Sequence, residues 1–413
     1  MHICYRSVNT KEKEILINLQ LLQFDGAGSV RYNEISILTK IWRFTMAYHY
    51  LDYEQLHDFC SAAFRSYGFD ETNSREITDI LLAADLNGTE SHGVQRMVRY
   101  DYEISCGMVD MSSEPKIVHE TPISAVIDAC NGMGQVVGRM AMKMAIEKAK
   151  TFGCGYVSVR RSNHYGIAGY YAEMAAAEDL MGLCMTNTEA IMVPTYGKQP
   201  MIGTNPIALA MPADPVPFSF DCATTVVPRG KFEVFTKRGD PVPVGWGVDE
   251  NGQDSTDAPR ILKNITAKAG GGILPLGGSS ELMGSHKGYG LGVICELFCA
   301  ILSGGITAER IYKTEDGGSG ICHSFIAIDY GIFGDKAEIK KSFSEYLQKL
   351  RESEKAEGCE RIYTHGEKEV DMRRLRREKG IPVNDKTLSE LRAIEKKLGQ
   401  YAVPFPAEAA PEM

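Results

Sequence analysis

The stretch Arg160-Arg161-Ser162-Asn163-His164-Tyr165-Gly166-Ile167-Ala168-Gly169-Tyr170-Tyr171 lies where a strand-like run, residues 156–159, gives way to a glycine-spaced helical start. The pattern places His164 at a strand-to-helix junction, where a side chain faces a cleft. An imidazole at such a place can exchange a proton with a bound substrate near neutral pH. A lone histidine is more often structural than catalytic, but Gly166, Ala168 and Gly169 let another group approach closely and so favour a catalytic role.

A second histidine starts a helical pattern, because His92, Arg96 and Tyr100 recur every four residues and share one helix face. A guanidinium can hold a carboxylate at two points, His92 can hydrogen-bond the neighbouring hydroxyl or carbonyl, and Tyr100 can close the pocket. Arg99 and Glu103 on the same helix indicate a solvated polar surface, which explains Arg96 equally well. Two interpretations stay open for the trio: a pocket for a small anionic hydroxyl-bearing molecule, or an ordinary surface.

Composition describes an ordinary globular protein. The chain has 413 residues, enough for a substantial core and two domains, and is 44% hydrophobic and 24% charged. A formal net charge of −9, a pI of about 5.6 and the lack of a basic patch argue against nucleic acid and anionic membranes as partners. The eleven cysteines form no CxxC pair, which predicts free thiols and no metal site; only Cys295 and Cys299 share a helix face. No apolar run is long enough for a membrane helix and no signal peptide is present, so we predict a cytoplasmic protein.

The pattern along the chain changes three times. Residues 1–45 show weak periodicity and are interpreted as an N-terminal extension, either a disordered arm or an artefact. Helical periodicity follows, with two helices over residues 51–86 and a third over 94–105. Short β-like runs then alternate with turns and helices: 124–127, 156–159, 182–186, 207–211, 218–221 and 324–329.

After Gly334 the pattern is helical again, with an apolar stripe of Ile339, Phe343, Tyr346, Leu347 and Leu350. The Lys/Arg/Glu-rich stretch over residues 349–379 predicts a solvated face. Helical ends that flank an α/β centre predict two domains. Residues 46–117 and 335–413 would form one discontinuous helical domain that carries substrate-pocket residues, and residues 118–334 an α/β domain.

The run from Gly132 to Gly138 is close to a dinucleotide-binding fingerprint, because it follows a strand and opens a helix. Its spacing is GxGxxxG rather than GxGxxG, and the expected acidic residue is missing. Arg160 and Arg161 stand there instead, which in a Rossmann fold would suggest a 2′-phosphate. The alternative is a glycine turn that feeds a packed helix.

Several strand ends and one helix start carry short polar groups. Thr188 ends one strand, Gly203-Thr204-Asn205-Pro206 is a turn before another, and Asp221-Cys222-Ala223-Thr224-Thr225 ends a third. Such ends often line a ligand crevice, although capping and turn roles are as common. Lys287 stands among glycines at the start of an apolar helix, an arrangement that suits a phosphate through backbone N–H groups and a point charge.

Taken together, these blocks resemble the malate/L-lactate dehydrogenase family, a group of NAD(P)-dependent oxidoreductases. The matching runs occur in family order between about residues 53 and 382: Ala84-Asp85-Leu86-Asn87-Gly88 with Ser91-His92-Gly93, then residues 162–169, 203–206, 221–225 and 286–291. The resemblance implies an α/β (α+β) fold that is not the Rossmann fold, with a largely antiparallel central sheet that binds NAD or NADP. It also implies a homodimer with active sites near the subunit interface.

The resemblance also implies roles for individual residues. His164 matches the general acid/base, and His92 and Arg96 match substrate-pocket positions. The cofactor-contacting positions are matched by Thr188, Asp221, Cys222, Ala223 and Lys287. Gly366 in His365-Gly366-Glu367 stands where family members usually have Pro-Gly-Glu or Pro-Gly-Gln.

These features lead to one main hypothesis, the reversible oxidation of a small 2-hydroxy acid, such as malate or lactate, to its 2-oxo acid by hydride transfer to a nicotinamide. His164 would take the hydroxyl proton, Arg96 would hold the C1 carboxylate, and His92 and Tyr100 would complete the substrate pocket. Alternatives within the family are a ureidoglycolate or sulfolactate dehydrogenase. Outside it they are a catalytically silent dinucleotide-binding protein and a Rossmann oxidoreductase that uses Gly132 to Gly138.

Overall fold

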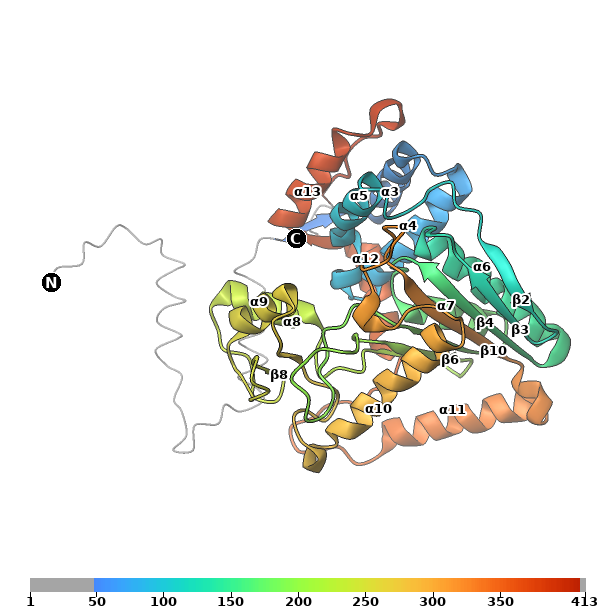
Figure 1. Cartoon of the computed structure of the whole chain (residues 1–413). Helices are drawn as coiled ribbons and strands as arrows, with labels where there is room; N and C mark the ends of the chain where they lie inside the picture. Colours follow the sequence, from blue (N-terminus) through green and yellow to red (C-terminus); the bar gives the residue numbers. More distant parts are fainter. Residues whose placement is uncertain (1–47, 409–413) are drawn as a thin grey trace, which may run out of the picture. The chain divides into compact units, whose positions relative to one another are not determined.

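The computed structural model describes residues 48–408 (Figure 1). The predicted extension, residues 1–45, lies outside the described residues. Contacts divide the chain into two units, residues 49–355 with 361–413 and residues 1–48 with 356–360. Of the second unit, the structure describes Tyr48 and the segment 356–360, which contains a turn. All that follows concerns the first unit.

The three predicted N-terminal helices are present. They are α3 (Tyr53–Tyr67), α4 (Glu71–Leu86) and α5 (Met97–Ser105). Side-chain caps fix where the first two begin, because Asp52 accepts from the Gln55 N–H and Asp70 from the Asn73 N–H. Gly68 ends α3 at a φ of +111°, a conformation that favours glycine.

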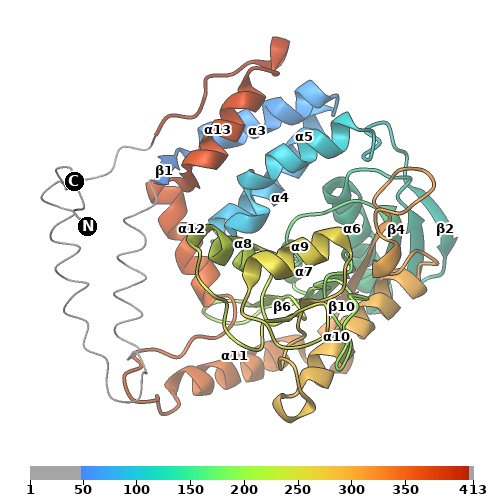
Figure 2. The same ribbon diagram turned by 60° about the vertical axis from the view of Figure 1, so that its left-hand side comes forward.

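These helices share a core with the C-terminal part of the chain. β11 (Ile381–Asn384) and α13 (Asp385–Glu395) supply Ile381, Leu391 and Ile394 to the cluster that contains Leu56 and Leu81. Figure 2 shows α3, α4, α5 and α13 side by side. The two ends of the chain therefore pack together, while the boundaries expected for a discontinuous helical domain stay a prediction.

The centre is a seven-stranded sheet, and it is largely antiparallel, as expected. Its only parallel pair among the described strands is β3–β4. In spatial order the strands are β2 (Lys116–Glu120), β3 (Ser124–Asp128), β4 (Cys154–Ser162), β10 (Ile321–Ile328), β5 (Met181–Thr186), β6 (Ile207–Met211) and β7 (Phe218–Cys222).

Helices cover both faces of this sheet (Figure 1). On one face α6 (Gly134–Phe152) and α7 (Ala168–Ala177) pack on Val157, Val159 and Phe325. On the other, α10 (Ser285–Glu296) continues into a π-helical turn, η4 (Leu297–Ile301). Cys295 and Cys299, expected on one helix face, are both buried there against Met185. Because successive strand residues point to opposite faces, the nearly continuous burial along β10 means that both faces of this central strand are covered.

The strand directions bring most of the predicted motifs to one edge of the sheet. Ile321 at the start of β10 pairs with Ser162 at the end of β4, and His323 pairs with Thr186 at the end of β5. Ile207 at the start of β6 pairs with Cys222 at the end of β7. The segments that carry His164, Thr188, residues 203–206 and residues 221–225 therefore leave or enter the sheet at the same edge.

A smaller group of elements has its own core. α8 (Arg229–Arg238), α9 (Ala258–Ala267), β8 (Gly247–Val248) and β9 (Gly272–Ile273) pack around Phe232, Ile261 and Ile265. The remaining elements are β1 (Tyr48–Leu51), α11 (Lys336–Glu352), α12 (Glu367–Lys379) and the 3-10 turns η1 (Glu90–His92), η2 (Val94–Arg96), η3 (Glu281–Met283), η5 (Ala308–Arg310), η6 (Tyr330–Phe333) and η7 (Gly399–Tyr401).

Two expectations for the C-terminal part need correction. α11 is helical, but of its apolar stripe only Leu347 is buried, and Tyr346 and Leu350 are exposed. The stretch over residues 349–379 is not wholly a solvated face, because Arg376 is buried. Its guanidinium donates to the Asp85 carbonyl at 2.6 Å and pairs with Glu90 at 2.6 Å, which anchors α12 to the end of α4. None of the described helices combines the length and apolar character needed to cross a membrane.

Candidate active site

The segment that joins β4 to α7 presents His164. Gly166 is required in this segment, because its φ is +89° and a Cβ there would lie 2.7 Å from Ile80 Cγ2. No side chain of the preceding residues caps α7. Instead, Asp221 at the end of β7, which is distant in the sequence, caps the helix by accepting the Gly169 N–H at 2.7 Å. His164 is thus fixed between the end of a central strand and a helix start that is tied to β7.

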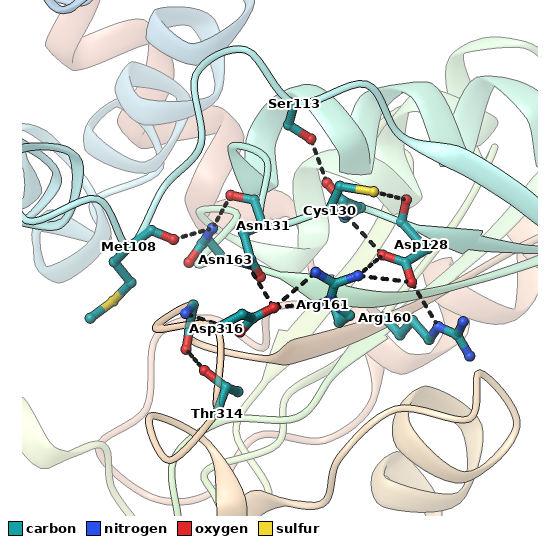
Figure 3. A network of polar contacts seen from close by, with 12 residues as sticks. Met108, Ser113, Asp128, Cys130, Asn131, Arg160, Arg161, Asn163, Thr314 and Asp316 are labelled. Carbon is teal, nitrogen blue, oxygen red and sulfur yellow. Dashed lines mark hydrogen bonds and ion pairs between the residues drawn. The ribbon is translucent and has the colours of Figure 1, made fainter.

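A polar network holds the chain just before His164 (Figure 3). The amide nitrogen of Asn163 donates to the carbonyls of Asn131 at 2.8 Å and Gly132 at 3.0 Å. Arg161 joins this loop to the one after η5, because it lies 3.2 Å from Asp128 and 2.8 Å from Asp316. Together these contacts fix the backbone to which His164 is attached.

Asp128 is the centre of the charges in this network. It also pairs with Arg160 at 3.2 Å and accepts the Cys130 N–H at 3.0 Å. Burial by itself raises the pKa of a carboxyl, but the Cys130 N–H and the two guanidinium groups lower the pKa of Asp128 below its usual range. Arg160 and Arg161 are therefore engaged with carboxylates of the chain itself rather than placed for a 2′-phosphate.

A buried histidine supports the same segment from the sheet. His323 on β10 places Nε2 3.1 Å from the Asn163 carbonyl and Nδ1 2.8 Å from the Thr186 hydroxyl. Burial lowers the pKa of His323 to about 3, so the ring is neutral. The carbonyl can only accept, so Nε2 carries the proton and donates it. Sequence reasoning did not single out His323, which lies within an apolar strand.

The loop between α4 and α5 presents His92 and Arg96. The Asp85 carboxyl group accepts the Val94 N–H at 2.8 Å. Gly93 is needed here, since a Cβ on it would lie 2.0 Å from an Asp85 oxygen. This contact explains the Ala84–Gly88 and Ser91–Gly93 runs as a structural pair, in which a buried carboxyl positions the backbone that carries the two candidate side chains.

The two histidines meet beside Tyr100. The imidazole rings of His92 and His164 are stacked, with centroids 5.5 Å apart and an interplanar angle of 29°. His164 Nδ1 lies 2.7 Å from the Tyr100 hydroxyl, and His92 Nδ1 lies 2.9 Å from the Ser91 hydroxyl. Because both Nδ1 atoms have partners from the chain, the Nε2 atoms are the ones left to contact a substrate.

Tyr100 itself is only 1% exposed. Its hydroxyl contacts His164 and receives a hydrogen bond from the Gln135 amide at 2.9 Å. The predicted trio is therefore brought together, but not by one helix face, because His92 and Arg96 lie in the 3-10 turns η1 and η2 and only Tyr100 lies on α5. Tyr100 lies behind His164 rather than across the mouth of a pocket. Gln135, on the first turn of α6, is a contributor that sequence reasoning missed.

Both imidazoles are neutral at pH 7. The pKa of His164 lies well below 6.5, because the ring is withdrawn from water and because Arg99, and then His92, add to the effect. Burial, with Arg96 and Arg99 nearby, lowers the pKa of His92 to about 3. A neutral imidazole with a free Nε2 can accept a proton from a hydroxyl group.

Arg96 is a cation without a carboxylate partner. Its Nε donates to the Ser91 carbonyl at 2.5 Å, and within residues 48–408 no carboxylate lies within ion-pair distance of it. Burial and the charge of Arg99 lower its pKa, yet a guanidinium stays protonated. An anionic ligand beside the two imidazoles would supply the missing counter-charge.

The expectation that Arg99 and Glu103 form a solvated surface is wrong. Glu103 is buried, and Arg99 pairs with it at 2.7 Å. The Arg99 guanidinium also donates to the Tyr312 hydroxyl, from the loop after η5. Sequence periodicity could not find this contact, because Tyr312 lies 213 residues away along the chain.

The candidate cofactor residues lie along the sheet edge that carries His164. Thr188 follows β5, and its hydroxyl accepts the Thr204 N–H at 2.9 Å. Asp221 and Cys222 end β7, and Ala223 follows them. The Leu276 N–H donates to the Thr224 carbonyl at 2.9 Å, and Gly288 on α10 packs so closely on Leu276 that a Cβ would lie 2.4 Å from its backbone. The α10 start is therefore continuous with this edge.

Lys287 lies on the first turn of α10. Its side chain is exposed, it makes no ion pair in the described chain, and no side chain caps the helix. Uncapped N–H groups, a free ammonium and short polar groups at strand ends form a donor set that suits the phosphates and hydroxyls of a dinucleotide. The residues present therefore fit such a group.

Gly366 is placed apart from this edge. It precedes α12 with a φ of +101°, and a Cβ there would lie 2.7 Å from the Pro217 carbonyl. The His365 carbonyl accepts the Ser219 N–H at 3.2 Å, near the start of β7, whereas Asp221 and Cys222 lie at its end. Its conformation alone accounts for a glycine here.

The near-fingerprint at Gly132 to Gly138 folds as a strand–turn–helix, but the chain itself fills its turn. A Cβ on Gly134 would lie 2.2 Å from the Asn163 carbonyl, and one on Gly138 would lie 2.9 Å from the Tyr171 ring. These glycines allow α6 to pack against the His164 segment. The geometry favours the packed-helix interpretation over a Rossmann phosphate site.

The described residues contain no cluster of three or more His, Cys, Asp or Glu side chains suited to a metal ion. The ten cysteines in residues 48–408 are free thiols.

Comparisons with known proteins agree with this architecture. The profile of the malate/L-lactate dehydrogenase family matches residues 51–392. The chain is 42% identical over 346 residues to a malate dehydrogenase from Pyrococcus abyssi, an alignment that covers 84% of this chain and 94% of that protein. It is 37% identical over 338 residues to an L-sulfolactate dehydrogenase from Methanocaldococcus jannaschii, covering 81% and 93%. The crystal structure of malate dehydrogenase from Entamoeba histolytica superposes with a TM-score of 0.83 at 37% identity, covering 87% of this chain and all of that one.

The fold and site thus define an oxidoreductase of malate dehydrogenase type that acts on the CH–OH group of its donor. The chain belongs to the malate/L-lactate dehydrogenase family.

Proposed function

We propose that this enzyme catalyses the reversible oxidation of a small 2-hydroxy acid to its 2-oxo acid with NAD or NADP. One observation carries the proposal: two neutral imidazoles with free Nε2 atoms lie next to Arg96, a guanidinium without a carboxylate partner in the described chain. That combination suits a molecule with a carboxylate beside a hydroxyl-bearing carbon.

Each side chain has one role in this proposal. His164 Nε2 takes the proton of the C2 hydroxyl in oxidation and returns it in reduction. Arg96 holds the C1 carboxylate through its two Nη groups, and His92 Nε2 hydrogen-bonds the substrate and fixes its orientation. Tyr100 acts through His164 by holding Nδ1, so that Nε2 faces the substrate.

The cofactor, when bound, supplies the nicotinamide ring that exchanges hydride with C2 of the substrate. We propose that Thr188, Asp221, Cys222 and Ala223 hold it along the sheet edge and that Lys287 holds its phosphates. Asp221 already accepts the Gly169 N–H, so its second oxygen is the one left for a cofactor hydroxyl.

Two substrate classes follow from the relatives. Malate carries a second carboxylate on C3, and sulfolactate carries a sulfonate there. The alignments to a malate dehydrogenase and to an L-sulfolactate dehydrogenase support both, and lactate-like acids lack this group.

A panel of 2-oxo acids assayed with NADH and with NADPH tests the proposal. We expect loss of the nicotinamide absorbance band with at least one 2-oxo acid, and a preference for one cofactor. No turnover of any acid by a folded protein that binds the reduced cofactor would favour a catalytically silent dinucleotide-binding protein.

We further propose a homodimer through the outer face of α10 and η4. One face of this helix packs on the sheet, but Val293, Ile294, Leu297 and Ile301 on the other face are 43 to 57% exposed. A helix that is apolar all round is expected to be buried on all sides. A second copy of the chain would cover this face.

A further inference from the structure

A second guanidinium lies one helical turn from Arg96. Arg96 is the N-cap residue of α5, with helical φ and ψ, and Arg99 follows three residues later on the first turn, so the two side chains project from neighbouring positions. The Arg99 Nε donates to Glu103 at 2.7 Å and its Nη2 donates to the Tyr312 hydroxyl. Two of its nitrogens are therefore held in place, and Nη1 is left without a partner from the described chain.

Arg99 lies close to the reacting centre. Its charge lowers the pKa of both His92 and His164, and it acts on the buried Tyr100 hydroxyl beside His164. Its side chain is 29% exposed, so the guanidinium is neither sealed in the core nor free on the surface. Arg99 directly precedes Tyr100, whose hydroxyl lies 2.7 Å from His164 Nδ1.

The partner that holds Arg99 is itself fixed to the sheet edge. Tyr312 has a φ of +62°, a conformation rare for a side chain of this size, and its N–H donates to the Ser319 carbonyl at 2.9 Å. The same loop is tied to the end of β5, because Asn187 donates to the Ile306 carbonyl at 2.9 Å. Unusual backbone of this kind is kept where the surrounding structure holds it, often at ligand sites.

The local charges are not balanced by the chain. Arg96 and Arg99 face a single ion-paired carboxylate, Glu103, and no second carboxylate lies within ion-pair distance of either guanidinium in the described residues. If Arg99 and Glu103 were only an ion pair on a solvated helix surface, Glu103 would not be buried and Arg99 would not contact Tyr312. In the proposed function the C1 carboxylate of the substrate binds Arg96, so Arg99 remains to bind a second anionic group.

We propose that Arg99, anchored by Glu103 and Tyr312, binds a second anionic group on C3 of the substrate, a carboxylate or a sulfonate. This inference rests on the proposed function. Arg99 would then select dianionic 2-hydroxy acids over lactate-like monoanions. The two arginines would bind different groups, because Arg96 binds the C1 carboxylate that all these substrates share.

Oxaloacetate and 2-oxobutyrate provide the test, because they have the same number of carbons and differ only in a carboxylate or a methyl group on C3. A hydrogen bond between charged groups corresponds to about a 10- to 150-fold difference in kcat/KM. We expect the wild type to prefer oxaloacetate by that factor or more. Arg99→Met should lower the ratio of kcat/KM for oxaloacetate to kcat/KM for 2-oxobutyrate by about the same factor, because any change at His164 acts on both acids alike. An assay with 3-sulfopyruvate shows whether a sulfonate is accepted in place of the carboxylate.

Arg374→Met is the matched control, since it removes an exposed arginine of α12 and should change neither substrate. Arg99→Lys should keep part of the preference, because the charge remains. Equal loss with both acids in Arg99→Met would mean a structural role and would overturn the inference. A wild type that uses both acids equally well would also overturn it, whether or not the variant folds. A wild type that reduces neither acid, nor any other 2-oxo acid, would instead contradict the proposed function.

Discussion

At the residue scale, His164 depends on neighbours that keep it neutral and oriented. Tyr100 contacts Nδ1, Gln135 contacts Tyr100, and His323 holds the carbonyl of the preceding residue. Burial and nearby cations lower the pKa of His164, so the ring accepts protons only weakly without a ligand. An anionic substrate beside Arg96 and Arg99 would offset those cations and bring the imidazole closer to the pKa that acid–base catalysis needs.

Replacing Tyr100 by Phe should lower the turnover rate by up to about tenfold, because a hydrogen bond of about 0.5–1.5 kcal/mol to Nδ1 is lost and the ring is less well oriented. The affinity for the reduced cofactor should be unchanged. Steady-state kinetics and a fluorescence titration of NADH or NADPH would measure both. Tyr102→Phe, on the same helix but exposed, is the control and should behave as the wild type. A Tyr100→Phe enzyme with normal turnover would show that His164 needs no partner at Nδ1.

Asp85 should make stability depend on pH. Burial raises the pKa of this carboxyl to about 8, against 3.8 in the unfolded chain. The folded state therefore keeps a proton that the unfolded state releases, and stability falls as pH rises between about 4 and 8. His92, His164 and His323 act in the opposite direction, and their contribution is nearly complete about one pH unit above 6.5. His49, whose pKa is raised by hydrogen bonds to Asp385 and Glu408, also contributes stability that is lost as pH rises between 6.5 and 8. The difference in slope between the wild type and Asp85→Asn in this range therefore isolates Asp85.

In that range the free energy of unfolding should fall by up to about 1.4 kcal/mol per pH unit. Asp85→Asn should flatten this slope, because an amide oxygen can still accept the Val94 N–H but cannot ionise. Urea unfolding at several pH values would measure it, with the exposed Asp240→Asn as the control. An unchanged slope in Asp85→Asn would mean that the carboxyl is already ionised in the folded state.

At the element scale, the Asp128 network joins three segments that are far apart in the sequence: the end of β3, the end of β4 and the loop after η5 (Figure 3). Asp128 is mostly buried, and its two arginine partners are partly exposed. Because its pKa is lowered in the folded state, its contribution to stability is present above about pH 4 and is lost as pH falls.

Asp128→Asn should lower the free energy of unfolding by about 1.5–3 kcal/mol at pH 7, the usual range for hydrogen bonds to a charged group. It should also reduce the loss of stability on acidification. Chemical unfolding at pH 7 and pH 4 would measure both effects. Asp58→Asn on α3, an exposed position, serves for comparison. If Asp128→Asn were as stable as the wild type at pH 7, the network would be a surface feature of little energetic value.

The sequence predicted most elements because their periodicity is local. α3, α4 and the central strands follow from apolar spacing, caps and glycines, and the family resemblance added the largely antiparallel arrangement. Arg376 and Glu103 were misjudged because burial of a charge is decided by partners from distant segments. The same reason hides Gln135, His323 and Tyr312: each contributes through one contact across the fold, and single residues in apolar or loop segments leave no periodic signal.

The candidate site was predictable in part. His164 was singled out by its place at a strand-to-helix junction, and His92, Arg96 and Tyr100 by their spacing; the structure brings them together. The sequence could not predict that Tyr100 lies behind His164, because helical spacing indicates which side chains lie near one another but not which groups they contact. The glycines at 132–138 are a case in which the sequence suggests a site that the structure does not form, because the turn that resembles a phosphate site is filled by other parts of the chain.

At the scale of the whole molecule, the outer face of α10 and η4 should mediate dimerisation. Leu297→Glu places a charge on this apolar face and should convert the protein to a monomer at micromolar concentration, as measured by light scattering after gel filtration. Val244→Glu changes a more exposed apolar residue elsewhere and should leave the dimer intact. A dimer that survives Leu297→Glu would place the interface on another surface.

The central claim is that the His164 imidazole exchanges the proton of the substrate hydroxyl. The most direct test is to measure how fast His164→Ala oxidises the hydroxy acid at saturation, together with its affinity for the reduced cofactor. We predict that this maximal rate falls by about 10²- to 10⁴-fold while cofactor affinity stays within about twofold, because general acid–base catalysis is lost and the cofactor residues are untouched. Unchanged turnover in His164→Ala would contradict the account.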